Sequence, residues 1–144
     1  MGIATMGKVL VTIKIENLGD LYAAEQGTMT GEQVRSVEVN NALVDTGATN
    51  FSMPKHLIQQ LGLKQFTSRR IRTSAGPVEV PVYGAVRVTV QDRNCTCDVV
   101  EIPDDCPVLL GQVPLELMDF VVDPVRMRIV GNPEHGGEWM ADQF

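Results

Sequence analysis

Aromatic residues, histidine and cysteine are scarce in this chain of 144 residues, which has one Trp, two Tyr, four Phe, two His and three Cys. An odd number of cysteines does not make a framework of paired disulfides. No apolar run approaches the ~18 residues that a membrane-spanning helix requires, and the N-terminus lacks the continuous apolar core of a signal peptide. Basic residues number 12 against 18 acidic ones, and the net charge of −6 argues against nucleic-acid binding. We therefore expect a cytoplasmic protein with no nucleic-acid partner and no membrane partner.

Branched apolar residues and turn formers are abundant instead. The chain has 20 Val and 7 Ile against 11 Leu and 8 Ala, together with 13 Gly and 8 Pro. Valine and isoleucine favour strands, and glycine and proline favour the tight turns between them. The composition predicts a mostly β fold. The length suits a single domain over residues 1–144, with its core at about 8–130 and a polar tail at 131–144.

Alternation of apolar and polar residues locates the expected strands. It predicts them at residues 9–16, 34–40, 42–44, 69–73, 78–80, 86–90, 95–102, 108–110, 120–122 and 125–130. Helices are predicted at 54–61, which a proline opens and a glycine ends, and at about 114–118. The polar stretch 17–33 is interpreted as a long surface loop or irregular hairpin, and the tail as frayed unless Trp139 anchors it.

One segment is informative about chemistry. Asp45-Thr46-Gly47 directly follows the apolar strand 42–44, and far downstream Val108-Leu109-Leu110-Gly111 forms a second apolar strand that ends in glycine before a helix. An Asp and a Gly at a strand end can be a turn and nothing more. Here the carboxylate follows a buried strand, and the glycine permits a tight turn directly after it. This setting favours a catalytic role for Asp45.

The arrangement resembles the retropepsin-like aspartic proteases, the single-domain relatives of pepsin. The resemblance covers about residues 8–130 and rests on 43–48, on a hairpin turn at 74–77, and on 108–111 followed by 114–117. It implies a closed β-barrel of the acid-protease fold with one or two short helices. It also implies the hydrolysis of peptide bonds by an activated water, with no covalent intermediate, no metal and no organic cofactor.

The resemblance also assigns roles to single residues. Asp45 matches the catalytic aspartate, Thr46 matches the residue whose hydroxyl holds the loop of the other subunit, and Gly47 belongs to the same active-site loop. Residues 71–79 match the flap that closes over the substrate. The residues implied to bind substrate are Ala48, Ser74, Ala75, Gly76, Pro107 and Leu109.

This chemistry requires two carboxylates about one water molecule, one to deprotonate the water and one to protonate the scissile carbonyl. The sequence has a single Asp-Thr-Gly. We therefore expect a two-fold symmetric homodimer that joins Asp45 of each subunit at its axis and hydrolyses an extended polypeptide as an aspartic endopeptidase. The alternative is a catalytically idle dimer of the same fold that only binds peptides or acts as a scaffold.

The sequence departs from the viral members of this family at three positions. Thr49, Asn50 and Gln112 stand where viral relatives carry charged residues that form an ion pair. The resemblance is accordingly closer to the bacterial and cellular members. The flap turn has one Gly and one Pro in place of several glycines, which predicts a stiffer flap.

Thiols and histidines outside the motif have a structural and a functional interpretation. Cys95 and Cys97 are predicted to share one face of a strand, and with Cys106 they are interpreted as core or surface thiols more readily than as a zinc site. His56 and His135 are both expected to be solvated.

The basic residues Lys64, Arg69, Arg70 and Arg72 cluster beside the predicted flap. They are interpreted either as an ordinary solvated strand face or as a feature that favours acidic residues in the substrate. Near the second helix, the apolar residues expected in the core are Leu115, Leu117, Met118 and Phe120. The strand 125–130 is a candidate for pairing across the dimer interface.

Overall fold

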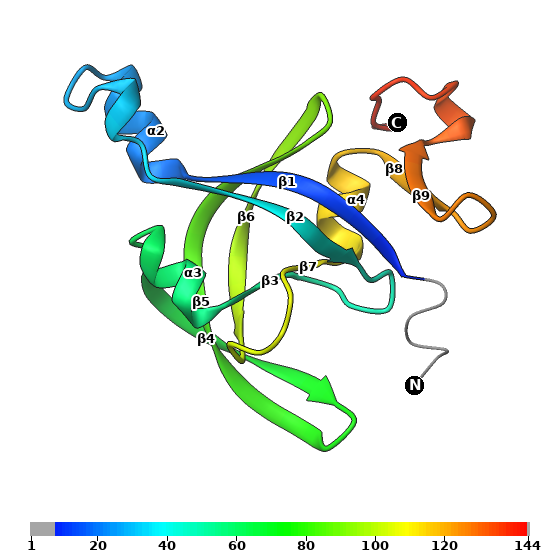
Figure 1. Cartoon of the computed structure of the whole chain (residues 1–144), viewed down its shortest axis with the longest axis horizontal. Helices are drawn as coiled ribbons and strands as arrows, with labels where there is room; N and C mark the ends of the chain where they lie inside the picture. Colours follow the sequence, from blue (N-terminus) through cyan, green and yellow to red (C-terminus); the bar gives the residue numbers. More distant parts are fainter. Residues whose placement is uncertain (1–7, 144) are drawn as a thin grey trace.

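The computed structural model describes residues 8–143, which form a mostly β structure whose strands close on themselves (Figure 1). The strands are β1 (Val9–Asn17), β2 (Ser36–Val44), β3 (Phe51–Pro54), β4 (Lys64–Thr73), β5 (Gly76–Val90), β6 (Arg93–Ile102), β7 (Leu109–Leu110), β8 (Phe120–Asp123) and β9 (Arg128–Gly131). The helices are α2 (Leu18–Glu25), α3 (Lys55–Gln60) and α4 (Gln112–Leu117), with 3-10 turns at Gly31–Gln33 and Pro133–His135. The predicted mostly β character is confirmed. The outermost residues of the predicted domain, 1–7 and 144, lie outside the described part.

The order of strand pairing explains how the ring forms. β1 pairs antiparallel with both β2 and β5, so the sheet order β1-β2-β7-β3-β6-β5 returns to its first strand. Within it, β7 runs parallel to β2 and antiparallel to β3, while β3 runs parallel to β6. β4 pairs with β5 alone and extends from the ring as one arm of a long hairpin. β8 and β9 form a separate two-stranded sheet.

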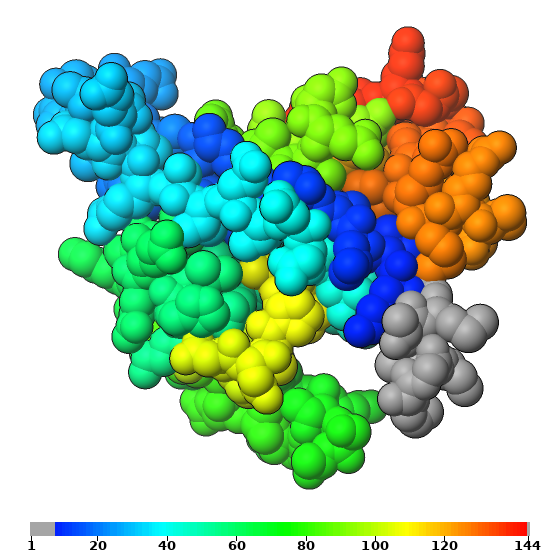
Figure 2. Space-filling view, viewed as in Figure 1, coloured from blue at the N-terminus to red at the C-terminus, as the bar shows by residue number. Residues whose placement is uncertain are grey.

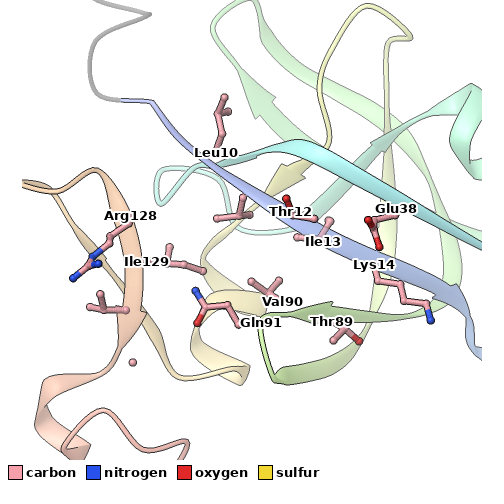
Figure 3. A pocket seen from close by; sticks show the side chains of 13 residues that line it. Leu10, Thr12, Ile13, Lys14, Glu38, Thr89, Val90, Gln91, Arg128 and Ile129 are labelled. Atoms are coloured by element: carbon pink, nitrogen blue, oxygen red, sulfur yellow. The ribbon is translucent and has the colours of Figure 1, made fainter.

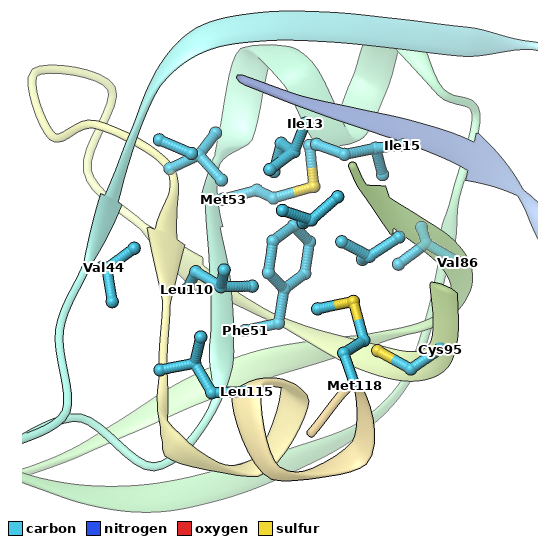
Figure 4. Close-up of a cluster of buried hydrophobic side chains, with 14 of the residues drawn as sticks. Ile13, Ile15, Val44, Phe51, Met53, Val86, Cys95, Leu110, Leu115 and Met118 are labelled. Carbon is cyan, nitrogen blue, oxygen red and sulfur yellow. The ribbon is translucent and has the colours of Figure 1, made fainter. Parts of the chain in front are cut away.

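Apolar side chains from the strands and from α4 fill the ring (Figure 4). The predicted alternation is visible in β5, where Val86, Val88 and Val90 are buried while the residues between them are only half-buried. Each such buried side chain contributes about 1.5–3 kcal/mol relative to an exposed one. β3 differs, because all four of its residues are buried and its sequence shows no alternation that would predict a strand. This is why the sequence pattern misses β3.

The prediction of one or two short helices is wrong, since residues 8–143 contain three. The stretch 17–33, which its polar composition predicts to be a loop, begins with helix α2. The Asn17 side chain caps this helix by accepting from the backbone N–H of Asp20 at 3.0 Å, and it donates to the carbonyl of Leu61 at 2.9 Å. The carboxylate of Asp20 in turn accepts from the backbone and the guanidinium of Arg35. Contacts with distant residues therefore stabilise a helix that local composition does not predict.

The C-terminal tail is anchored and not frayed, which is the alternative expected if Trp139 holds it. Trp139 is the predicted anchor, and its indole N–H donates to the carbonyl of Leu117 at 3.1 Å. His135 is not solvated as expected: its side chain is 10% exposed and lies 2.6 Å from a carboxylate oxygen of Asp119 and 3.1 Å from one of Asp142. These contacts join the tail to the corner between α4 and β8.

The C-terminal elements differ from the sequence interpretation in two further respects. Leu117 is 51% exposed and does not belong to the core, whereas Leu115, Met118 and Phe120 are buried as expected. The final strand is β9 at Arg128–Gly131, where the sequence predicts 125–130, and it pairs with β8 within the chain. Pairing of this strand across a dimer interface stays a prediction. Within the described residues, no helix has the length and apolar character needed to cross a membrane.

Candidate active site

Asp45 stands at the end of β2, where strands from distant parts of the chain meet. Its backbone N–H donates to the carbonyl of Leu110 at 3.0 Å. The short strand β7 lies between β2 and β3, so that Leu110 pairs with Val44 on one side and with Phe51 on the other. Val44, Phe51 and Leu110 are all buried. The core therefore fixes the point at which Asp45 leaves the ring.

A tight turn orients the carboxylate of Asp45. The backbone N–H of Gly47 donates to its Oδ1 at 3.0 Å, and the N–H of Ala48 donates to its backbone carbonyl at 3.1 Å. Asp45 is half-buried, while Thr46 and Gly47 are exposed. Within residues 8–143 no side chain donates a hydrogen bond to Oδ2, so this oxygen remains available for a water or a proton.

The second motif holds this turn from behind through backbone contacts. At the start of α4, the N–H of Gln112 donates to the carbonyl of Ala48 at 2.7 Å, and that of Val113 donates to the carbonyl of Thr49 at 3.0 Å. Gly111 makes the approach possible, because a Cβ there would lie 2.3 Å from the carbonyl oxygen of Asn50. The charged residues of the viral pattern are thus replaced by main-chain hydrogen bonds, and the Gln112 side chain donates to Glu116 within the helix instead.

The predicted flap is the hairpin of β4 and β5, and its tip is formed by Ser74 and Ala75. Thr73 organises the tip, since its hydroxyl donates to the carbonyl of Gly76 at 2.7 Å and accepts from the N–H of Ala75 at 3.2 Å. Gly76 has a φ of 107°, a backbone conformation that L side chains rarely adopt. Figure 2 shows open space between the hairpin, drawn in green at the bottom, and part of the body above it.

One side chain links the hairpin to the active-site loop. Arg69 of β4 donates from Nη1 to Oδ1 of Asn50 at 2.6 Å, and Asn50 belongs to the loop that follows Asp45. The sequence patterns that contain these two residues do not predict a contact between them. Their contact depends on how the hairpin is placed against the loop, which local sequence does not specify.

The structure brings some of the predicted site residues together and leaves others apart. Ala48 belongs to the Asp45 turn, and Leu109 pairs with Leu43 two residues before the aspartate. Pro107 is exposed in the loop before β7. The tip residues at 74–76 form no hydrogen bond with the Asp45 turn within the described part of the chain.

A protein-family model described as aspartyl protease matches residues 26–113. The match includes the Asp45 turn, the whole hairpin, β7 and Gly111. The chain belongs to the aspartyl protease family. It is of the retropepsin-like kind, in agreement with the resemblance of its motifs. No curated protein sequence matches the chain.

A cleft on this aspartyl protease lies away from Asp45. It has a volume of about 790 Å³ and runs between β1 and β9, with Gln91 and neighbouring residues of β5 at its floor (Figure 3). Its lining mixes Lys14, Glu38 and Arg128 with apolar side chains. Asp45 is not among the lining residues, so this cleft is separate from the candidate catalytic group.

The thiols and acidic groups do not converge on a metal site in residues 8–143, where no three His, Cys, Asp or Glu side chains are placed to hold an ion. Cys95 is buried, and Cys97 and Cys106 are half-buried. A hydrogen bond between Cys95 and Cys97 lowers the pKa of Cys95 and raises that of Cys97.

Proposed function

We propose that the protein is an aspartic endopeptidase whose catalytic pair consists of Asp45 from two identical subunits. The observation that supports this most directly is the placement of Asp45: a half-buried carboxylate on a turn fixed by Leu110 and by α4, inside the segment that matches the aspartyl protease family. Thr46 and Gly47, beside it, are exposed and free to be covered by a second subunit.

The need for two subunits follows from the reaction. One carboxylate takes a proton from the attacking water while the other, protonated, donates to the scissile carbonyl, giving a tetrahedral intermediate without a covalent bond to the enzyme. Two carboxylates in contact share one proton, because ionising both at short range is costly. Within residues 8–143, no hydrogen bond or ion pair joins Asp45 to a second carboxylate. A two-fold axis beside Asp45 supplies the missing partner.

The hairpin and the Asp45 turn define the path of the substrate in this proposal. An extended polypeptide can pair its backbone with β-structure on either side of the scissile bond. The hairpin then closes over it, excludes water and holds the bond in place above the two carboxylates. Ala48, which belongs to the Asp45 turn, and Leu109, which pairs with Leu43 before it, would contact the substrate side chains nearest the cleaved bond.

Replacement of the aspartate tests the proposal. Asp45→Asn keeps the size of the side chain and removes its charge, and we expect it to abolish cleavage of a random peptide mixture across about pH 3–7, the range in which a shared-proton pair operates. Asp92→Asn is the matched control, because Asp92 is exposed in the turn between β5 and β6. A wild type that binds peptides but cleaves no more than Asp45→Asn would establish the idle peptide-binding dimer instead.

Mixing the two forms tests whether the site is shared. When wild type and Asp45→Asn are exchanged at equal amounts, about half of the wild-type subunits enter mixed dimers. If each site needs both aspartates, the activity per wild-type subunit falls to about half. Activity that stays the same or rises, with exchange verified by mass spectrometry of the intact dimers, would show that one Asp45 suffices and would contradict the shared pair.

A further inference from the structure

The hairpin carries an excess of positive charge on an acidic protein. Lys64, Arg69, Arg70 and Arg72 all lie on β4, and Glu79 is the only acidic residue of the two facing arms up to Val82. The whole chain has a net charge of −6. Within the described residues, none of these four cations forms an ion pair with a carboxylate. The hairpin is therefore a local positive region, in which Glu79 faces Arg70 across the two strands and no carboxylate faces Arg69.

Strand geometry separates these cations into two faces. Successive side chains of a strand point to opposite sides, and the pairing between Ser68 and Thr73 is regular. Arg69 therefore shares a face with Ile71, while Arg70 and Arg72 lie on the other face. Because Arg69 reaches Asn50, its face is the one turned toward the active-site loop. Arg69 is thus the arginine of the cluster that the structure places beside the catalytic turn.

Asn50 uses only one of the hydrogen-bond donors of Arg69. A guanidinium has five N–H donors and a fixed charge, and its best partner is a carboxylate held by two parallel hydrogen bonds. Asn50 supplies one neutral oxygen, so the charge of Arg69 has no counterion there. Asn50 is itself held in place, because its backbone packs against Gly111. The arginine is positioned, charged and able to accept an acidic ligand.

On the basis of the proposed endopeptidase function, we propose that Arg69 makes the enzyme select polypeptides with an acidic side chain close to the scissile bond. A substrate lying between the hairpin and the Asp45 turn passes the face that carries Arg69. In a two-fold dimer each subunit contributes one such arginine. The preference for Asp or Glu therefore applies at two positions, one on each side of the cleaved bond and related by the two-fold axis.

Matched peptides test the preference. We compare kcat/KM for a cleaved peptide with that of peptides in which single residues are changed between Glu and Gln. We expect Glu to exceed Gln by about tenfold at the favoured positions, as for a charge-assisted hydrogen bond. The ratio falls toward one below about pH 4, where the substrate carboxyl is protonated, and it shrinks at high ionic strength.

Two variants of the same strand separate Arg69 from the charge of the hairpin as a whole. Arg69→Gln brings the Glu/Gln ratio close to one, and Arg69→Glu inverts the preference toward Lys-containing peptides. Arg70→Gln removes the same charge from the opposite face and retains the ratio. Equal losses in Arg69→Gln and Arg70→Gln would assign the preference to the general field of the hairpin and overturn the proposal.

The same measurements distinguish a failure of the Arg69 proposal from a failure of the proposed endopeptidase function. Cleavage that depends on Asp45 but shows no difference between Glu and Gln peptides at any position refutes the role of Arg69 alone. No Asp45-dependent cleavage of either peptide type refutes the endopeptidase function itself. In that case, tighter binding of Glu peptides by wild type than by Arg69→Gln, measured by fluorescence anisotropy, still supports Arg69 as a binding site for acidic side chains.

Discussion

Substitution of Gly111 by alanine is the most direct test of how the active-site turn is held. The added Cβ would lie 2.3 Å from the carbonyl oxygen of Asn50, 2.8 Å from that of Ala48 and 2.9 Å from the backbone N of Asn50. Ordinary contacts of a Cβ begin at about 3.4 Å, so a shift of roughly 1 Å is required. The φ of Gly111 is −84°, which alanine adopts freely, so the whole cost is steric.

The structure indicates how large this cost is. The three atoms belong to the main chain of a loop fixed at both ends by β2 and β3, and they cannot rotate away as side-chain atoms do. Overpacking of this kind costs about 1–3 kcal/mol. Moving the loop also strains the two hydrogen bonds from Gln112 and Val113, each contributing about 1 kcal/mol. We expect a loss of about 3 kcal/mol in the free energy of unfolding, or roughly 10 °C in Tm.

Urea denaturation of Gly111→Ala and of a control variant measures this loss. Gly31→Ala is a suitable control, because a Cβ at Gly31 meets no atom within 4 Å and its φ is not positive. We expect the control to stay within about 0.5 kcal/mol of wild type. Peptide cleavage by Gly111→Ala should fall even at temperatures where the variant is folded, since the displaced loop carries Asp45. Equal urea midpoints for the two variants would refute the steric argument.

Two further predictions concern the stability contributed by the ion pairs of the C-terminal tail and of helix α2. Hydrogen bonds to Asp119 and Asp142 raise the pKa of His135 above its ordinary value of 6.5, so its contribution is complete below that pH and is lost as the pH rises through the raised pKa. The urea midpoint of wild type relative to His135→Gln should therefore decline from about pH 6.5 upward, and parallel pH profiles would contradict it. Arg35→Gln leaves the carboxylate of Asp20, which is 5% exposed, without its cation, and should cost about 1–2 kcal/mol because Arg35 is itself half-exposed. The double variant with Asp20→Asn should regain most of this loss in a denaturation series, and an additive further loss would show that the two residues act independently.

Local sequence patterns predict the parts of this fold in which one face of a strand is buried. β1, β5 and β6 alternate because each has one side toward the core, and Asp45-Thr46-Gly47 is recognisable because its neighbours are apolar. The sequence pattern misses β3 and α2 for different reasons. β3 is buried at every position, so it has no alternation, and α2 depends on Asn17 and Asp20 reaching residues far along the chain.

Contacts between distant segments set the remaining features of the site. The sequence contains Asn50 and Arg69, but these two partners lie 19 residues apart, and the Asp119 that buries His135 lies 16 residues before it. His135 illustrates the consequence, since a histidine in a polar tail is expected to be solvated until Asp119 is placed beside it. Closure of the ring through β1 and β5 is equally nonlocal, because the two strands are separated by three others in the chain.

The absence of the viral ion pair and the contact between the hairpin and the loop are parts of one arrangement. A charged pair at the positions of Asn50 and Gln112 would tie the loop to α4 through side chains. Here the backbone of Ala48 and Thr49 makes that connection, so the side chain of Asn50 is free to face the hairpin and bind Arg69. Because Asn50 is neutral, it holds Arg69 without cancelling its charge. Arg69 is therefore a positioned cation beside the Asp45 turn. In the proposed function, an acidic side chain of the substrate would be its counterion.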